Sequence, residues 1–385
     1  MPLRSNWSYP TAVRMGAGRI AELAEACRGA GITKPLLVTD PGLSGLPMIA
    51  HAVEICRAAG LPVVVFDTVQ ANPIDRNVED GVAVFRAGGH DGVIAFGGGS
   101  ALDCGKVIAF AAGQTRPLWD FEDIGDWWTR ANPDAIAPII AVPTTAGTGS
   151  ETGRAGVITN SATHTKKVIF HPLMMPKVVI ADPELTVGLP PRMTAGTGMD
   201  ALSHCLEAYC APGYHPMADG IAVEGARLVH AHLRTAVRDG ADIIARTHMM
   251  AAAAMGSTAF QKGLGAMHAL AHPMGALFNT HHGMTNAVLM PYVLAFNRAA
   301  IEARIERLAA YCGMSPGFDA YVAEILALRA DIGVPHTLLE LGIDRDYRTK
   351  IIEMAIVDPT AGGNPVLLDA AAAGALFDAA WNGRL

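Results

Sequence analysis

Short runs of β-branched and apolar residues alternate with longer helical stretches over roughly the first 185 residues, and this alternation limits the possible folds more than any other feature. "KPLLVTD" (34–40), "LPVVVFD" (61–67) and "GVIAFGGGS" (92–100) are typical of buried strands. Helical stretches separate them, such as "LPMIAHAVEICRAAG" (46–60). Strands that alternate with helices in this way predict a parallel sheet with helices on both faces.

The pattern changes near residues 185–195, where "ADPELTVGLPPRMTAGTG" is rich in proline and glycine. Beyond it the chain is rich in Ala, Leu and Met, with apolar residues at helical spacing, as in "AVEGARLVHAHLRTAV" (222–237). A chain of 385 residues is also longer than one typical core. We therefore expect an α/β domain over residues 1–187 and an all-α domain over residues 188–385.

The composition excludes several classes of protein. Hydrophobic residues make up 51% of the chain, yet no run reaches the roughly 20 apolar residues that span a bilayer. The start, "MPLRSNWSYP", lacks the apolar segment of a signal peptide. A formal net charge of −7 argues against a nucleic-acid partner. We expect a cytoplasmic globular enzyme or binding protein whose six scattered cysteines are reduced, buried thiols.

A run of glycines follows the third strand and precedes a helical stretch. Glycines at such a turn let the backbone approach a phosphate, and the free N–H groups of the helix start favour negative charge. The run matches neither the GxGxxG fingerprint nor a P-loop, and a tight turn is the alternative. We expect it to hold the phosphates of a cofactor, through Gly97, Gly98, Gly99 and Ser100.

Two further features point to the same ligand. Asp40 ends the first strand, where an acidic residue can accept hydrogen bonds from an adenosine ribose and would repel a 2′-phosphate. Taken alone, Asp40-Pro41-Gly42 is more typical of a turn. Hydroxyl groups for ribose or pyrophosphate oxygens come from Thr144, Thr145 and Thr148. Together these features predict NAD rather than NADP.

Histidines gather in one short apolar stretch, "HALAHPMGALFNTHHG" (268–283), which holds four of the chain's fourteen. Imidazole is the commonest protein metal ligand and a ready proton carrier. His268 and His272 lie four residues apart and so share one face of a helix, whereas His282 is expected in a loop. For this stretch alone, a helix end followed by a polar loop is the alternative.

A second pair with the same spacing lies upstream, in "AGTGMDALSHCLEAY" (195–209). Asp200 and His204 also share one helix face, in apolar surroundings where an unpaired carboxylate would be unfavourable. One carboxylate and three imidazoles form a ligand set for Fe²⁺ or Zn²⁺ that leaves room for water or substrate. The two segments hold more histidines than four-coordination needs. One of them should therefore be a ligand partner or a proton carrier, and the spacing leaves open which.

The motifs "GGGSALDCGK", "PTTAGTGSE", "GMDALSHCLEAY" and "HALAHPMGALFNTHHG" occur in this order along the chain. In this respect the chain resembles the iron-containing (group III) alcohol dehydrogenases, and the resemblance spans nearly the whole length. It implies an N-terminal dinucleotide-binding α/β domain and a C-terminal helical domain that binds the metal. It also implies a homo-oligomer, a dimer or larger.

The resemblance assigns roles to single residues. The metal ligands it implies are Asp200, His204, His268 and His282. His272 becomes the catalytic histidine near the reacting end of the cofactor, while His281 has no family role and is expected to be an exposed loop residue. The positions that line the NAD site are Asp40, Gly97, Gly98, Gly99, Ser100, Asp103, Thr144, Thr145 and Lys166, with Lys167 as the alternative to the last.

The activity that the resemblance implies is hydride transfer between a nicotinamide and a short-chain primary alcohol or aldehyde, with the metal polarising the oxygen. The family name implies Fe²⁺, although the ligand types suit Zn²⁺ equally. One alternative is an NAD- and metal-dependent lyase resembling dehydroquinate synthase, whose ligand set differs. Another is a non-catalytic NAD- or metal-binding protein. Metal-free relatives such as the maleylacetate reductases are disfavoured because the ligand set is complete.

One departure from the family concerns the substrate. Lys262 lies six residues before His268, in a segment where relatives that act on neutral alcohols often carry polar amides. Arg154 follows the Thr/Gly loop. We hypothesise that Lys262, with Arg154, receives an anionic group of the substrate, such as a carboxylate or sulfonate. The alternative is that Lys262 is a solvated lysine or contacts the cofactor phosphates.

Overall fold

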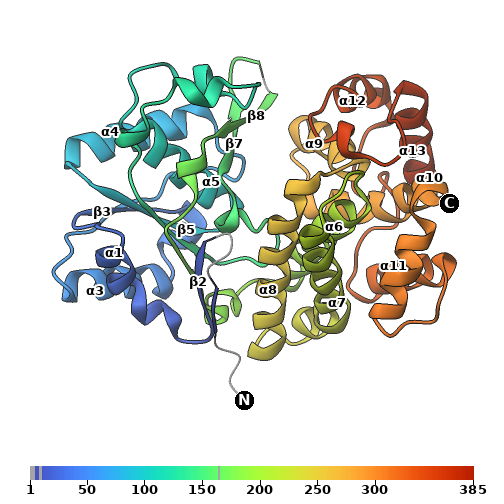
Figure 1. Cartoon of the computed structure of the whole chain (residues 1–385), viewed down its shortest axis with the longest axis horizontal. Coiled ribbons are helices and arrows are strands. Elements are labelled where there is room, and N and C mark those ends of the chain that lie inside the picture. Colours follow the sequence, from blue (N-terminus) through green and yellow to red (C-terminus); the bar gives the residue numbers. More distant parts are fainter. Residues whose placement is uncertain (1–4, 8–10, 164) are drawn as a thin grey trace. The chain divides into compact units, whose positions relative to one another are not determined.

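A seven-stranded sheet with helices on both faces organises the N-terminal part of the chain (Figure 1). The computed structural model describes residues 5–7, 11–163 and 165–385. Most of the segment on which the signal-peptide prediction rests lies outside these described residues. The strand order is β1-β2-β9-β6-β5-β3-β4. The strands are β1 (Ser5–Trp7), β2 (Ala12–Met15), β3 (Pro35–Val38), β4 (Val64–Phe66), β5 (Gly92–Gly97), β6 (Ile139–Pro143) and β9 (Val178–Ala181).

The chain divides into two compact units. The first comprises Met1–Thr145 and Gly149–Val187, and the second comprises Ala146–Thr148 and Gly188–Leu385. The predicted ranges therefore differ from these units only in residues 146–148. The helices of the first unit are α1 (Leu23–Gly29), α2 (Pro41–Ser44), α3 (Pro47–Ala58), α4 (Asp75–Gly88) and α5 (Gly99–Ala111).

All neighbouring strands of the sheet are parallel except β1 and β2. Only four residues separate β1 from β2, which is too few for the crossover that parallel neighbours need, so this edge pairs antiparallel. A separate antiparallel hairpin, β7 (Ala155–Asn160) with β8 (Thr165–Phe170), was not predicted. The predicted fold class, a parallel sheet with helices on both faces, is confirmed.

The two faces of the sheet are covered by different helices, because alternate residues of a strand point to opposite sides. Leu37, Ile94 and Val142 join one core with residues of α1 and α3. On the other face α5 lies so close that a Cβ atom on Gly105 would be 2.7 Å from the Cβ atom of Ala95. Glycine at this position therefore lets α5 approach β5 and brings its first turn to the end of that strand.

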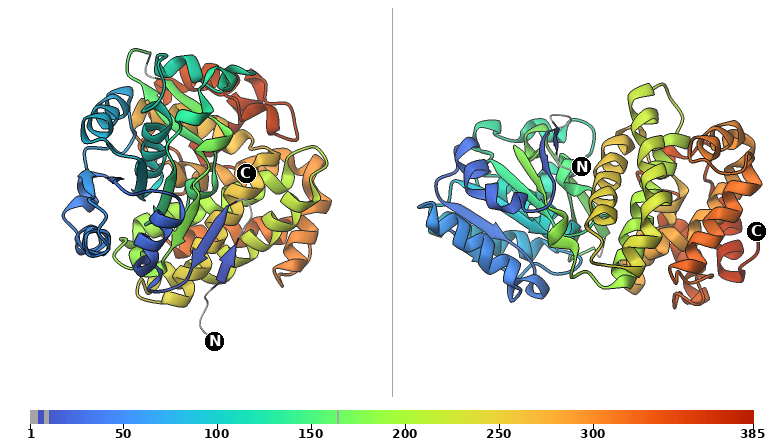
Figure 2. Two further views of the ribbon diagram at one scale, coloured as in Figure 1. Left: turned by 60° about the vertical axis from the view of Figure 1, so that its left-hand side comes forward. Right: turned by 90° about the horizontal axis from the view of Figure 1, so that it is seen from below.

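The second unit is built of helices only, as two further views confirm (Figure 2). Its central helix is α6 (Pro191–Cys210), which is buried from Thr194 to its last residue and packs against α7, α8 and α10. None of the helices in the described part of the chain combines the length and apolar character needed to cross a membrane. The other helices are α7 (Pro216–Arg238), α8 (Ile243–Ala259), α9 (Ala266–Phe278), α10 (His282–Tyr311), α11 (Phe318–Asp331), α12 (Arg348–Ala355) and α13 (Ala370–Asn382).

All six cysteines are free, as predicted, and five of them are buried. Cys312 is the exception, because it lies just beyond the last residue of α10 and is half-buried.

Candidate metal centre and nucleotide site

Three of the predicted metal ligands converge inside the helical unit. Asp200 and His204 lie one turn apart on α6, and His268 lies on α9. Their candidate ligand atoms all lie within 4.8 Å of one another, and all three residues are buried. The imidazole rings of His204 and His268 are stacked, with 4.9 Å between their centroids. Two helices thus bring one carboxylate and two imidazoles to a single point, as the spacing predicted.

His282 joins this group from a different element than expected. It is the first residue of α10 rather than a loop residue, and its Nε2 atom lies 3.6 Å from Asp200 Oδ1. The start of α10 comes very close to α6, because a Cβ atom on Gly283 would lie 2.1 Å from the carbonyl oxygen of Gly196. Only glycine fits such a contact, and the close contact carries His282 to the carboxylate.

His281 also differs from its expected exposed position. It is the N-cap of α10, where its Nδ1 atom accepts a hydrogen bond from the N–H of Met284 at 3.4 Å. Its ring packs against Gly196, and this burial lowers the pKa of His281. The loop prediction was wrong for His282, whereas His281 lies just outside the helix as its N-cap, since a histidine can cap a helix in place of the usual Ser, Thr, Asp or Asn.

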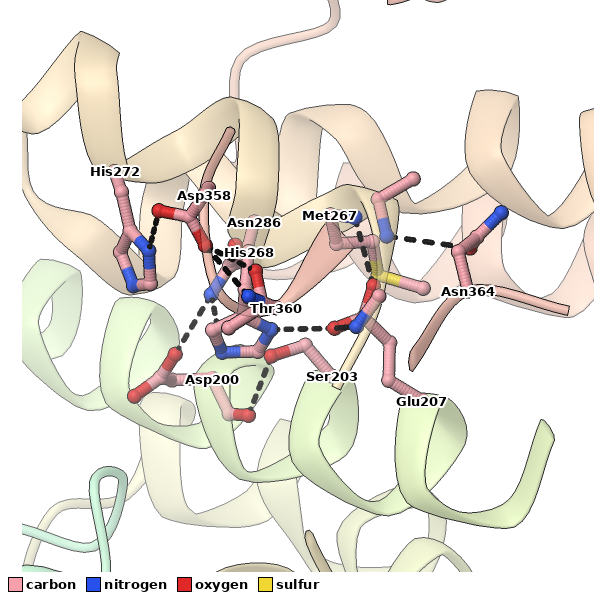
Figure 3. Close-up of polar contacts among 12 residues, drawn as sticks. Asp200, Ser203, Glu207, Met267, His268, His272, Asn286, Asp358, Thr360 and Asn364 are labelled. Atoms are coloured by element: carbon pink, nitrogen blue, oxygen red, sulfur yellow. Dashed lines mark hydrogen bonds and ion pairs between the residues drawn. The ribbon is translucent and has the colours of Figure 1, made fainter. Parts of the chain in front are cut away.

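Asn286 supplies a polar group that the sequence analysis missed. Its Nδ2 atom lies 3.0 Å from Asp200 Oδ1 and 3.2 Å from His268 Nε2 (Figure 3). The same atom lies 3.2 Å from His282 Nε2. The signal was present in the sequence, since Asn286 follows His282 by four residues and shares its helix face. The amide nitrogen thus lies within hydrogen-bond distance of three of the four candidate ligands, and its two hydrogens serve two of them at a time.

The electrostatics of the cluster favour a bound cation. Burial alone raises the pKa of Asp200, but the nearby imidazoles of His204, His282 and His268 and the Asn286 amide outweigh it and lower the pKa to about 2. Burial, together with the neighbouring His204, lowers the pKa of His268 well below its usual value. The carboxylate is therefore ionised and the His268 imidazole neutral, which are the forms that bind metals.

His204 provides the test of whether these residues fit a metal. Its Nδ1 atom is buried and has no hydrogen-bond partner in the structure. An unsatisfied buried polar atom destabilises a fold by about 1–3 kcal/mol. A buried imidazole nitrogen without a partner, beside an ionised carboxylate and further imidazoles, suits a divalent transition metal, and the candidate holders are Asp200, His204, His268 and His282.

Two carboxylates support the histidines of α9, and neither was predicted. Glu207 Oε2 lies 2.6 Å from His268 Nδ1, and Asp358 Oδ2 lies 2.9 Å from His272 Nδ1 (Figure 3). Burial raises the pKa of Glu207 to about 7, although the hydrogen bonds that it accepts from backbone N–H groups lower the pKa. Glu207 continues the spacing of the ligands on α6, whereas Asp358 lies 86 residues from His272 and left no signal in the sequence.

The glycine run lies where the sequence analysis expected it, at the turn from β5 into α5. Gly97 has a φ of 148°, which favours glycine, and Gly98 is the N-cap of α5 without a side-chain cap. Asp40 lies beside this turn, because a Cβ atom on Gly97 would be 3.5 Å from Asp40 Oδ2. Thr145 lies beside it as well, because a Cβ atom on Gly98 would be 3.3 Å from Thr145 Cγ2. The first unit thus gathers the acidic residue, a threonine and the uncapped helix start.

Several of the other predicted cofactor residues have structural contacts of their own. Asp103 accepts hydrogen bonds from Ser150 Oγ at 2.5 Å and from the N–H of Val157 at 3.0 Å, and it pairs with Lys106. Ser100 Oγ donates to the carbonyl of Ala71. The remaining positions are Gly99 in the first turn of α5, Thr144 after β6, Thr148 in the second unit and Lys166 on β8.

Lys262 lies in surroundings that differ from the expected ones. Its side chain is only 2% exposed and its ammonium group pairs with Asp219. It also donates to the carbonyl of Tyr209, near the C-terminal end of α6, at 3.2 Å. Arg304 contacts the same carbonyl and the same carboxylate. Lys262 thus has its charge balanced within the helical unit, where it stabilises the end of α6.

Arg154 remains available for ligands. Its side chain is exposed at the start of the β7–β8 hairpin, and its guanidinium lies 5.7 Å from the centroid of the Phe170 ring. Among the residues that the structure describes, no carboxylate pairs with it.

A parallel α/β unit with a glycine turn, followed by a helical unit with a buried carboxylate–histidine set, defines a metal-binding dehydrogenase. The family model for iron-containing alcohol dehydrogenases matches residues 10–183, and the C-terminal model of the same family matches residues 194–381. The chain therefore belongs to the iron-containing alcohol dehydrogenase family, as its motifs predicted. Members of this family depend on NAD(H) and bind a metal.

Individual relatives agree with this assignment. The chain is 40% identical over 367 residues to a 4-hydroxybutyrate dehydrogenase of Cupriavidus necator, covering 93% of this chain and 94% of that one. A crystal structure of a 1,3-propanediol oxidoreductase is similar with a TM-score of 0.92 and 37% identity, covering 99% and 100% of the two chains. The crystal structure of a sulfoacetaldehyde reductase from Bifidobacterium kashiwanohense in complex with NAD+ is similar with a TM-score of 0.87 and 28% identity. The match covers 99% of this chain and 98% of that one. The chain is an alcohol dehydrogenase, and the lyase alternative is not preferred.

Proposed function

We propose that this chain is an NAD(H)-linked, Fe²⁺-dependent dehydrogenase of short primary alcohols. The observation that carries the proposal is the convergence of Asp200, His204 and His268, three buried residues from two helices, on one point. His282 completes the set. The relatives support the choice of substrate class, since their names include a hydroxy acid, a diol and a sulfonated aldehyde.

Different residues of the chain have different roles in the proposed reaction. A metal held by Asp200, His204, His268 and His282 would supply the Lewis acid that polarises the substrate oxygen, and a bound nicotinamide would supply or take up the hydride. His272 stands next to the ligands, with its ring stacked on that of His282 at 5.3 Å between centroids. The Nδ1 atom of His272 is hydrogen-bonded to Asp358, so its Nε2 atom is the one that exchanges a proton with the substrate or the cofactor hydroxyls. Asp40 and the turn at Gly97 hold the adenosine end and the phosphates.

The metal requirement gives the direct test. Protein purified without oxygen is stripped with a chelator and reloaded with Fe²⁺ or Zn²⁺, and NADH formation from 1,4-butanediol is followed. We expect turnover with Fe²⁺, little with Zn²⁺, and none in the stripped protein. Equal turnover of stripped and reloaded protein would refute the metal-dependent mechanism.

The cofactor preference is expected to depend on Asp40. Replacing it by Ser keeps a good N-cap for α2, where Asp40 now accepts from the N–H groups of Gly42 and Leu43. The substitution removes the charge that repels a 2′-phosphate. The ratio of kcat/KM with NADP+ to kcat/KM with NAD+ should therefore rise about tenfold or more, which corresponds to about 1.4 kcal/mol less repulsion. An unchanged ratio of the two kcat/KM values would show that Asp40 only caps the helix.

The anionic-substrate hypothesis is expected to involve Arg154 rather than Lys262. The test compares 4-hydroxybutyrate with 1,4-butanediol, which has the same carbon chain but no charge. We expect Arg154→Met to raise KM about tenfold for the acid alone, because a charge-assisted hydrogen bond contributes about 1.5–3 kcal/mol. Lys262→Met should leave the ratio of the two KM values unchanged and lower the melting temperature. A selective effect of Lys262→Met would restore the original hypothesis.

Three further predictions accompany the proposal. We expect a cytoplasmic protein, a homo-oligomer of two or more chains, and neither a nucleic-acid nor a membrane partner. The free, buried cysteines agree with a reducing compartment. The mass of the native protein in solution tests the oligomeric state.

A further inference from the structure

The carboxylate of Glu207 lies within hydrogen-bond distance of three nitrogen atoms of α9 and the residue before it (Figure 3). Its Oε1 accepts from the N–H of Met267 at 2.7 Å, and its Oε2 accepts from the N–H of Gly265 at 2.8 Å. The third contact joins Oε2 to His268 Nδ1 at 2.6 Å. The backbone groups can only donate, so both oxygens of Glu207 act as acceptors, and for the ionised carboxylate the third contact is an N–H donated by His268 Nδ1 to Oε2.

The opposite side of the same ring leads to the same assignment. His268 Nε2 lies 3.2 Å from Asn286 Nδ2, an amide nitrogen that can only donate. A hydrogen bond from this amide requires an unprotonated Nε2, whose lone pair points toward the side where Asp200 and His282 also meet Asn286. The contacts on both sides of the ring are thus satisfied by one tautomer, with the proton on Nδ1.

The position of Glu207 explains how it reaches His268. It lies seven residues after Asp200 and three after His204 on α6, so the three side chains share one face of that helix. The helix α9 begins without a cap of its own, since its N-cap residue is Gly265. Glu207 caps it instead, together with Asn364, whose Oδ1 accepts from the N–H of Ala266 at 3.2 Å.

We propose that Glu207 is a positioning residue of the metal centre, which holds His268 in the Nδ1–H tautomer and so presents Nε2 to the metal. One helix then supplies two ligands and also the group that orients a third. The inference rests on the proposed function, because it requires His268 to bind the metal. A carboxylate behind a ligating imidazole fixes the ring and raises its basicity, and its loss weakens metal binding about 10–100-fold.

Glu207→Gln tests this role, with Asn364→Ala as the matched control. The glutamine has one acceptor oxygen in place of two, so it cannot receive all three N–H groups. The control removes the other cap of α9 and leaves His268 untouched. The measurement is the dissociation constant of Zn²⁺, by competition with a coloured chelator, and the visible spectrum of the Co²⁺-loaded protein. We expect Glu207→Gln to weaken Zn²⁺ binding about 10–100-fold and to alter the Co²⁺ spectrum.

For Asn364→Ala we expect a lower melting temperature, but Zn²⁺ binding within about threefold of wild type and an unaltered Co²⁺ spectrum. Zn²⁺ binding by Glu207→Gln within about threefold of wild type would overturn the proposal. An equal loss of affinity in both variants would overturn it as well, because the effect would then come from capping alone.

A measurement on the wild-type protein covers the case in which Glu207→Gln does not fold. Nitrogen-15 NMR of histidine-labelled protein, loaded with Zn²⁺, reports which ring nitrogen of His268 carries the proton. A proton on Nδ1 supports the proposal, and a metal bound through Nδ1 overturns it. Failure of the proposed function is recognised separately, since Asp200→Ala would then bind Zn²⁺ as the wild type does, whatever the result for Glu207→Gln.

Discussion

Replacing Asp200 with Ala is expected to abolish tight metal binding and to lower kcat/KM by a factor of about 1,000 or more. Asp200 is the only carboxylate of the predicted ligand set, and its pKa of about 2 keeps it ionised at any working pH. A bound metal contributes several kcal/mol of transition-state stabilisation, and each 1.36 kcal/mol is a factor of ten in rate.

The Asp200→Ala experiment measures iron per chain after anaerobic reloading, together with kcat/KM for 1,4-butanediol. Stripped wild-type protein is the control, because it shares the loss of metal without the loss of the side chain. We expect the two to be equally inactive, and only the wild type to recover when Fe²⁺ is added. Stoichiometric iron in the variant would show that the metal is held elsewhere.

Replacing His272 with Phe is expected to lower kcat by a factor of about 100–10,000 while leaving the metal content unchanged. Phenylalanine keeps a flat ring against His282 but has no nitrogen to move a proton, and general acid–base catalysis contributes about this much. The His272 side chain is 30% exposed, whereas that of the candidate ligand His268 is 2% exposed, so His272 is open to the solvent in a way that His268 is not.

Two companion variants sharpen the test of His272. Asp358→Asn keeps the shape of the partner but removes the charge that favours the Nδ1–H form, so we expect a smaller loss of kcat, about tenfold. His281→Asn keeps a good N-cap for α10 and should leave kcat near the wild-type value. A kcat of His272→Phe within about threefold of wild type would remove His272 from the proton path.

Local patterns in the chain carry most of the information that predicts its fold. Strand–helix alternation predicted the α/β unit, and residues four apart on a helix identified Asp200 with His204 as partners in one site. The antiparallel edge strand was missed because a strand of three residues carries little pattern. The position of His282 was wrong because helix α10 begins with a histidine cap, which is not among the usual start signals.

Two of the contacts that were not predicted join residues far apart in the chain. Asp358 and Asn364 reach α9 from a segment nearly 100 residues away, and no periodicity links them to it. Lys262 was assigned from its distance in sequence to His268, but the structure shows that its charge is balanced by Asp219. The pairing of a charged side chain depends on helix packing, which sequence spacing does not encode.

All four candidate metal ligands lie in the helical unit, between Asp200 and His282, while the glycine turn and Asp40 lie in the other. The two candidate sites are therefore built from separate segments of the chain, so a substitution can alter the metal ligands without touching the glycine turn or Asp40, and the reverse.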